Sequence, residues 1–267
     1  MKLGVEVLFE SRLDLLRGRR VGLITNPTGV DRTLASIVER FRTHPEIKLT
    51  ALYGPEHGVR GNAQAGEFVA FFQDEHFRLP VFSLYGQALK LPTNALADID
   101  AKMREFDTQH AGKQVERDML RDIDALVFDL QDVGTRVYTY LATMAYAMSA
   151  AAEAGIPFVV LDRPNPINGV AMEGPILEFP RHSSFIGLYP IPLRHGMTAG
   201  ELAQLFNERF VGASLADASS EWHRLPADEL RLEAAATWAS ASDAPTNRSL
   251  KSSASSPAVM PWRSGIG

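Results

Sequence analysis

Five short segments of this chain are apolar along almost their whole length, and helical patterns separate several of them. Leu141, Met144 and Met148, for example, recur at the spacing of one face of a buried helix. Apolar strands that alternate with helices are typical of a parallel sheet covered on both faces, because both sides of each strand are buried. We therefore predict an α/β fold with a mostly parallel sheet and helices on both faces. The predicted strands lie within residues 21–25, 47–58, 79–86, 124–132 and 157–166.

Composition excludes several classes of function. The 267 residues carry a formal net charge of -5, whereas proteins that bind nucleic acid need a basic face for the phosphate groups. The chain contains no cysteine, which rules out disulfides, thiol catalysis and cysteine-ligated zinc. We therefore expect no nucleic-acid partner and no thiol chemistry.

The sequence also lacks the usual signals for export or membrane insertion. Residues 1–20 contain no continuous apolar stretch of the kind that a signal peptide needs. The longest apolar region, residues 140–161, is interrupted by Glu153, Gly155 and Pro157, so we expect a helix and a strand there rather than a membrane span. On this basis we expect a cytoplasmic protein.

Polar residues follow the predicted strands at the point where each strand ends. Asn26 follows the first strand, Glu56 the second, Asp132 the fourth and Asp162 the fifth. Because ligands of open parallel sheets bind beyond the carboxyl ends of the strands, we expect these side chains to line one site.

The segment around Glu56 and His57 suits acid–base chemistry. Gly54, Gly58 and Gly61 permit tight turns on either side of the two residues. One interpretation is a general acid or base beside a polar group that orients it. The other is a surface loop with a salt-bridged glutamate.

The segment after the fourth strand is also open to two interpretations. Asp132 and Arg136 either face a ligand or pair with each other and cap the following helix. Tyr138 and Tyr140 either stack on the face of a sugar or pack against the protein.

Two further loops carry candidate binding residues. X-Pro bonds stiffen residues 161–175, which suits either a preformed site or simple stability. Residues 194 and 195 directly precede a predicted helix N-terminus, which suits either an anion site or ordinary capping. The candidates on these loops are Asp162, Arg163, Asn165, Glu173, Arg194 and His195.

Several familiar motifs are absent from the sequence. It has no G-x-G-x-x-G after the first strand, no G-x-x-x-x-G-K-[ST], no G-x-S-x-G and no H-E-x-x-H. A metal site would therefore need a spatial cluster, such as His57 with His195 and a carboxylate. We expect no metal and no cofactor.

Five segments, taken together and in this order, resemble the exo-β-N-acetylmuramidases of the NamZ type, a family long catalogued as a domain of unknown function. The resemblance covers about residues 2–212. It implies a Rossmann-like N-terminal domain and a smaller C-terminal domain that closes over the cleft. It also implies release of N-acetylmuramic acid from the non-reducing end of peptidoglycan fragments, without a cofactor. The segments are "YGPEHGVRGNAQAGE", "PVFSLYG", "LVFDLQDVGTRVYTY", "FVVLDRPNPINGVAMEGP" and "RHGMTAGELAQLFNE".

Glycoside hydrolysis usually needs two carboxyl groups. Under this resemblance we assign Glu56 as the general acid, because its glycine-flanked loop can approach a sugar closely, with His57 as its neighbour. Asp132 is the leading candidate for the second carboxylate, and Glu173 is the next. Assistance by the acetamido group of the substrate would need only one nearby carboxylate to orient that group.

The substrate implied by the resemblance carries a lactyl carboxylate, which suits a fork-shaped guanidinium group. Arg136, Arg163 and Arg194 are the candidates to bind it. The alternatives are a protein that binds muropeptides or sugars without catalysis, an inactive truncated homologue, and a metal-dependent hydrolase that uses His57 and His195.

The composition changes after about residue 212, where Ala and Ser make up roughly two-fifths of the sequence. We expect a Rossmann-like domain at 1–180, the start of a C-terminal domain at 181–212, and a poorly ordered tail at 213–267. The motifs expected of the family's C-terminal domain are missing from that tail. We therefore expect a truncated or frame-shifted gene.

Overall fold

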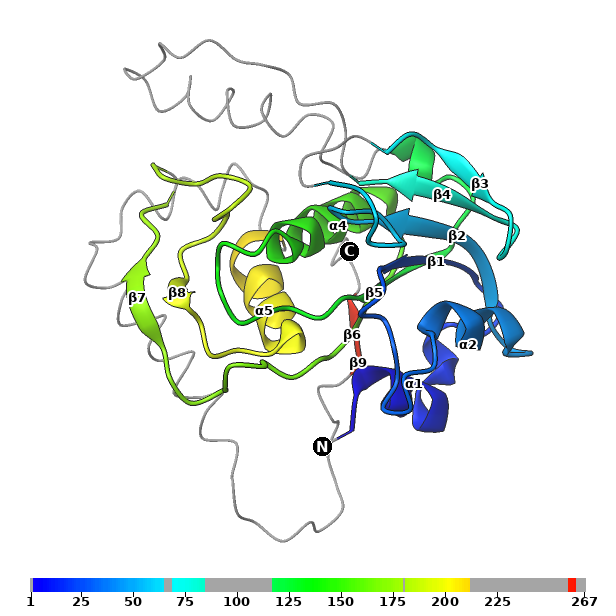
Figure 1. Ribbon diagram of the computed structural model, residues 1–267, viewed down its shortest axis with the longest axis horizontal. Helices are drawn as coiled ribbons and strands as arrows, with labels where there is room; N and C mark the ends of the chain where they lie inside the picture. Colours follow the sequence, from blue (N-terminus) through cyan, green and yellow to red (C-terminus); the bar gives the residue numbers. More distant parts are fainter. Residues whose placement is uncertain (1, 65–68, 85–116, 180, 212–258, 263–267) are drawn as a thin grey trace, which may run out of the picture.

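The computed structural model describes residues 2–64, 69–84, 117–179, 181–211 and 259–262 (Figure 1). Its main feature is a seven-stranded sheet of order β3-β4-β2-β1-β5-β6-β9. Five neighbouring strands run parallel, which confirms the predicted strands and the α/β fold. They are β1 (Arg20–Thr25), β2 (Lys48–Gly54), β4 (Leu79–Ser83), β5 (Ala125–Asp129) and β6 (Phe158–Leu161).

Both edge strands are antiparallel, and neither was predicted. At one edge β3 (Phe72–Asp74) pairs with β4, and at the other β9 (Val259–Trp262) pairs with β6. In the expected tail, β9 is the only segment that the structure describes. The rest of that prediction falls outside the described residues.

Helices cover both faces of the sheet, because successive side chains of each strand point to opposite sides. Leu23 packs with the helix residues Leu8 and Phe41 on one face, whereas the next residue, Ile24, belongs to the cluster with Met144 on the other. Figure 1 shows α1 and α2 on the side of the sheet opposite α4 and α5. The helices are α1 (Gly4–Ser11), α2 (Ile37–Thr43), α4 (Tyr140–Ala154) and α5 (Ala199–Phe206). Shorter helical turns are η1 (Leu13–Leu15), η2 (Arg117–Leu120) and η3 (Asn207–Val211).

Local sequence sets the ends of the helices that flank the candidate site. Gly155 ends α4 in the left-handed region, with φ of 68°. Thr198 precedes α5 and accepts a hydrogen bond from Glu201 N, while the Glu201 carboxylate accepts one from Thr198 N. This capping box fixes the N-terminus of α5.

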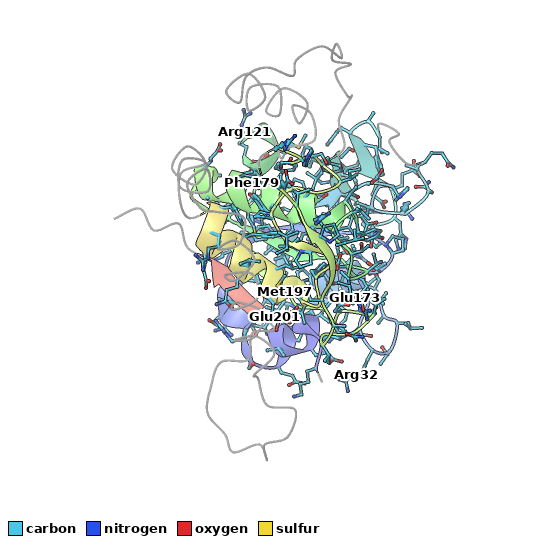
Figure 2. All side chains as sticks on the ribbon, turned by 90° about the vertical axis from the view of Figure 1, so that its left-hand side faces the viewer. Arg32, Arg121, Glu173, Phe179, Met197 and Glu201 are labelled. Carbon is cyan, nitrogen blue, oxygen red and sulfur yellow. The ribbon has the colours of Figure 1, made fainter. Side chains whose placement is uncertain are left out.

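A small second sheet lies beside the carboxyl ends of β5 and β6. Its strands β7 (Glu173–Ile176) and β8 (Pro192–Arg194) are antiparallel, and Thr135, in the segment after β5, forms a bridge to Arg194. Figure 2 looks at the face on which β7 lies, with Glu173 and Met197 labelled. A domain boundary was expected at residue 180, between β7 and β8. That boundary stays a prediction.

In the part of the chain that the structure describes, we find no helix with the length and apolar character needed to span a membrane.

Candidate active site

The strand order reverses between β1 and β5, and ligands of open α/β sheets bind beyond the carboxyl ends of the strands at such a point. Hydrogen bonds join the loops there. Thr25 Oγ1 donates to Asp129 O (3.1 Å), and Gln131 N donates to Thr28 Oγ1 (3.1 Å). Gln131 Nε2 also donates to Pro164 O (2.8 Å), in the loop after β6. The ends of β1, β5 and β6 thus form one polar rim.

Glu56 lies two residues beyond β2, at this same edge, and is partly buried. Thr139 Oγ1 donates a hydrogen bond to Glu56 Oε2, with 2.7 Å between the two oxygens. Thr139 directly precedes α4. The carboxylate therefore lies at the N-terminal end of that helix, which carries a partial positive charge.

Asn26 and the two tyrosines lie beside this carboxylate. Asn26 Nδ2 donates to Tyr140 Oη (2.7 Å), and the rings of Tyr138 and Tyr140 meet edge to face with centroids 4.5 Å apart. Burial raises the pKa of the Tyr140 phenol, and the neighbouring Tyr138 hydroxyl and the charge of Glu56 raise it further. The structure thus brings together four of the predicted residues: Asn26, Glu56, Tyr138 and Tyr140.

His57 has an unusual backbone. Its φ is +72°, in the left-handed region that side chains with a Cβ rarely adopt. Its Nδ1 lies 3.0 Å from Ala63 O. Since a carbonyl oxygen only accepts, Nδ1 carries the proton, and Nε2 of the neutral ring is the acceptor. A strained residue beside a candidate acid is typical of a functional site.

Asp132 and His195 form a buried pair. Met197 N donates to His195 Nδ1 (3.2 Å), so the proton of the neutral ring is on Nε2, which lies 3.1 Å from Asp132 Oδ2. Gly134 N donates to the same oxygen (2.7 Å). His195 has 0% exposure and Asp132 has 5%. In this arrangement His195 holds Asp132 in place and has no surface with which to contact a ligand.

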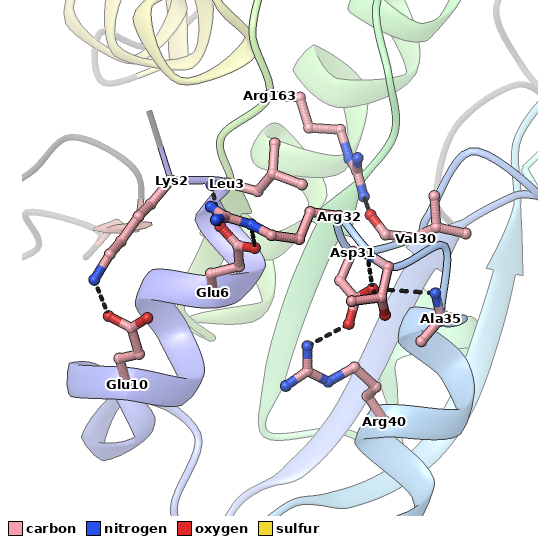
Figure 3. A network of polar contacts seen from close by, with 11 residues as sticks. Lys2, Leu3, Glu6, Glu10, Val30, Asp31, Arg32, Ala35, Arg40 and Arg163 are labelled. Carbon is pink, nitrogen blue, oxygen red and sulfur yellow. Dashed lines mark hydrogen bonds and ion pairs between the residues drawn. The ribbon is translucent and has the colours of Figure 1, made fainter.

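Arg163 is engaged inside the protein. Its Nε and Nη2 donate to the two carboxylate oxygens of Asp129, at 2.6 and 3.0 Å, and Nη2 also donates to Val30 O (2.9 Å), as Figure 3 shows for Val30. Burial raises the pKa of Asp129, and the charge of Arg163 opposes that effect. The guanidinium group predicted to bind substrate is thus committed to a buried ion pair.

Asp162 caps the start of α5. Thr198 Oγ1 and Gly200 N donate to its two carboxylate oxygens, at 3.1 and 2.7 Å. Burial raises the pKa of Asp162, and the bond from Gly200 N opposes that effect. These contacts join the end of β6 to the helix.

The remaining arginines lie at the small sheet. Arg136 Nη1 donates to Pro175 O (2.8 Å) and Ile191 O (2.6 Å) rather than to Asp132, and burial lowers the pKa of this guanidinium. Arg194 Nη1 lies 3.1 Å from Glu173 Oε1, and the Glu173 side chain is 64% exposed.

Asn165 ties this region to the rest of the rim. Its Nδ2 donates to Met197 O (3.0 Å), and its Oδ1 accepts from Ile167 N (3.1 Å). Among the residues that the structure describes, no three His, Cys, Asp or Glu side chains are arranged to hold a metal ion.

Comparison with known proteins identifies the family. A family model described as "Exo-beta-N-acetylmuramidase NamZ, N-terminal" matches residues 21–115 and 102–247, which together make up most of the chain. The chain belongs to the NamZ family. It is 54% identical over 207 residues to the peptidoglycan β-N-acetylmuramidase NamZ of Bacillus subtilis (strain 168), covering 78% of this chain and 44% of that protein.

Two crystal structures of DUF1343 family proteins from Bacteroides fragilis NCTC 9343 are also similar to this chain. Their TM-scores are 0.63 and 0.53, at 44% and 33% sequence identity. Each comparison covers 78% of this chain and 46% or 47% of the other. The chain thus spans about half the length of the NamZ relatives that it matches.

Sequence reasoning missed several residues that build this NamZ site. Thr139 contacts Glu56, and Thr28 and Gln131 join the strand ends. A Thr before a helix and a Gln after a strand are common, so neither gave a signal. Their positions next to predicted site residues were the only indication in the sequence.

Proposed function

We propose that this chain is a glycoside hydrolase that releases N-acetylmuramic acid from the non-reducing end of peptidoglycan fragments. Membership of the NamZ family and the name of the Bacillus subtilis relative support this reaction. One observation in the structure carries the proposal. A glutamate, Glu56, lies beyond β2 at the carboxyl edge of the sheet, and one of its carboxylate oxygens accepts a hydrogen bond from Thr139 in the segment after β5.

In this proposal Glu56 is the general acid. It gives its proton to the glycosidic oxygen as the bond from that oxygen to the anomeric carbon breaks. Tyr138 and Tyr140 lie beside the carboxylate and offer an aromatic face for a sugar ring. His57, whose Nε2 is an acceptor in the neutral ring, belongs to the same group.

The second carboxylate in this proposal is Asp132, which follows β5 at the same rim. Its 5% exposure and its bonds from His195 and Gly134 favour an orienting role over direct attack on the sugar. Glu173 is exposed but paired with Arg194, on the second sheet.

Arg194 is the arginine that we propose for the lactyl carboxylate. Arg163 is engaged with Asp129, and Arg136 donates to two backbone carbonyl oxygens. Arg194 Nη2 donates to Ile167 O (2.8 Å), but its Nη1 pairs with an exposed glutamate that a ligand carboxylate can replace. We expect Arg194→Met to raise KM by about tenfold, with a smaller change in kcat.

The experiment that tests the proposal is hydrolysis of a chromogenic β-N-acetylmuraminide. We expect the wild-type chain to release the chromophore. Glu56→Gln should lower kcat/KM by about 10³-fold on a disaccharide of N-acetylmuramic acid and N-acetylglucosamine, whose leaving group needs a proton, without a change in melting temperature. Glu178→Gln, at an exposed glutamate, is the matched control and should keep full activity. Binding of N-acetylmuramic acid by calorimetry without any product would instead identify a binding protein.

A further inference from the structure

Thr139 stands where a helix cap is expected but makes no capping bond. Threonine before a helix ordinarily accepts a hydrogen bond from a backbone N–H of the first turn. Thr139 has φ of -66° and ψ of -15°, which is helical rather than extended, and its side chain accepts no such bond. The hydroxyl group instead points to Glu56, which lies 83 residues earlier in the chain.

The backbone that carries this hydroxyl is held in place by its surroundings. Thr139 is 9% exposed. Its carbonyl oxygen accepts from Thr143 N (3.0 Å) and Thr143 Oγ1 (3.2 Å). The next residue, Tyr140, is held by Asn26 at the end of β1. The start of α4 is therefore anchored to β1 on one side of Glu56, and these contacts hold the Thr139 backbone beside the carboxylate.

We infer that Thr139 is a positioning residue for proton transfer from Glu56, an inference that rests on the proposed glycosidase function. The Thr139 hydroxyl donates to Oε2, so the acidic proton of the protonated carboxyl group belongs on Oε1. The hydroxyl also stabilises the carboxylate that remains once the proton has gone, because hydrogen bonds to an ionised group are the stronger ones. Thr139 itself does not touch the reacting atoms.

The reaction balances as follows. The proton on Glu56 Oε1 moves to the glycosidic oxygen while the bond from that oxygen to the anomeric carbon breaks, and the bonding electron pair stays on the oxygen. Water then adds its hydroxyl group to the anomeric carbon and gives its proton to a carboxylate base. The contribution of Thr139 belongs to the first of these steps, in which the leaving group needs a proton.

Leaving-group dependence separates this role from a structural one. A dinitrophenolate leaves without protonation, whereas a sugar hydroxyl needs a proton from the acid. We expect Thr139→Val to lower kcat/KM by about 30-fold on a disaccharide of N-acetylmuramic acid and N-acetylglucosamine, but by only about threefold on dinitrophenyl β-N-acetylmuraminide. Thr139→Ser keeps the hydroxyl and should restore the disaccharide rate to within about threefold of wild type.

Ser149→Ala is the matched control. Ser149 lies further along α4 and is partly buried, and its hydroxyl donates to Ala145 O (3.2 Å), a bond that involves neither Glu56 nor Thr139. We expect its effect on the two substrates to be equal. Melting temperatures of all three variants show whether each one folds.

Three results would contradict the inference. Equal losses on both substrates in Thr139→Val would show a structural role, as would failure of Thr139→Ser to restore the disaccharide rate. If wild-type protein cleaves neither substrate, the proposed function fails and the inference fails with it. Normal wild-type turnover with equal losses in Thr139→Val removes the inference alone.

Discussion

The two sides of the candidate site use their charged residues differently. On the β5–β6 side, which comprises Asp129, Asp132, Asp162, Arg163 and His195, the carboxylates are bound by protein donors and at most 9% exposed. On the β1–β2 side, which comprises Asn26, Glu56 and His57 together with Thr139 and Tyr140 at the start of α4, Glu56 is partly exposed and accepts a hydrogen bond from the neutral Thr139 hydroxyl. The first side builds the fold, and the second is the side on which we propose the chemistry.

The physical reason is desolvation. A charge removed from water must be paired and hydrogen-bonded, so the deeper carboxylates bind arginine, histidine or a helix N-terminus. A catalytic acid needs a proton that it can lose, and a tightly bound arginine would hold the group ionised. Acidic residues at the carboxyl end of a parallel sheet therefore differ in availability, although they share the same place in the topology.

The largest effect that we expect tests whether the β5–β6 side is structural. Arg163→Met leaves Asp129 buried without its cation, and we expect it to lower the free energy of unfolding by about 3–5 kcal/mol. Urea unfolding measures this change. Arg194→Met, which removes a partly exposed pair, should cost less than about 1 kcal/mol. A small loss in Arg163→Met would mean that this arginine is available to bind substrate, and the contrast between the two sides would fail.

More of the fold than of the candidate site could be predicted from the sequence. A strand that is buried on both faces has a continuous apolar sequence, such as the run within residues 124–132. The parallel strands, and the sheet edge at which polar residues gather, could therefore be predicted. The antiparallel strands β3 and β9 could not be predicted, because short edge strands have little periodic pattern.

At the site, sequence could place residues but could not orient them. Arg163 and Glu56 give the same signal, a charged residue just after a strand. In the structure the Arg163 side chain folds back onto Asp129, while Glu56 meets the start of α4. Long-range contacts of this kind decide which side chain is available to bind a ligand, and local sequence patterns carry no information about such contacts.

The next prediction tests how rigid the β5–β6 side is. Gly134 and Gly155 both have positive φ, +83° and +68°. A Cβ at Gly134 would lie 2.5 Å from Asn165 Oδ1 and 2.6 Å from Ile167 Cγ1, whereas a Cβ at Gly155 would meet nothing within 4 Å. We expect Gly134→Ala to cost about 3 kcal/mol, from backbone strain and overpacking, and Gly155→Ala about 1 kcal/mol from strain alone. If thermal or urea unfolding shows the same loss of unfolding free energy in both variants, the loop around Asn165 moves easily to make room for the new Cβ.

The smallest effect that we expect concerns a carboxylate that follows β1 but is engaged like those on the β5–β6 side. Asp31 accepts hydrogen bonds from Thr33 N (2.8 Å), Thr33 Oγ1 (2.7 Å), Ala35 N (3.1 Å) and Arg40 Nη1 (2.6 Å), part of the network in Figure 3. The hydrogen bond from the Thr33 hydroxyl, helped by the backbone N–H groups and Arg40, lowers the pKa of Asp31 to about 2.

A folded-state pKa below the unfolded value of about 3.9 means that ionised Asp31 stabilises the fold above pH 4, and that this stability is lost as the pH falls from 4 to 2. We expect Asp31→Asn to lower the free energy of unfolding by about 1 kcal/mol at pH 7, and the difference from wild type to shrink towards zero near pH 2. Urea unfolding at several pH values measures it, with the exposed Asp14→Asn as a control that should stay within about 0.5 kcal/mol of wild type. A difference for Asp31→Asn that does not change with pH would show that its hydrogen bonds, and not its charge, hold the segment after β1. The ionised state of a hydrogen-bonded carboxylate such as Asp31 would then contribute nothing to stability. The contrast with Glu56 would rest on exposure alone.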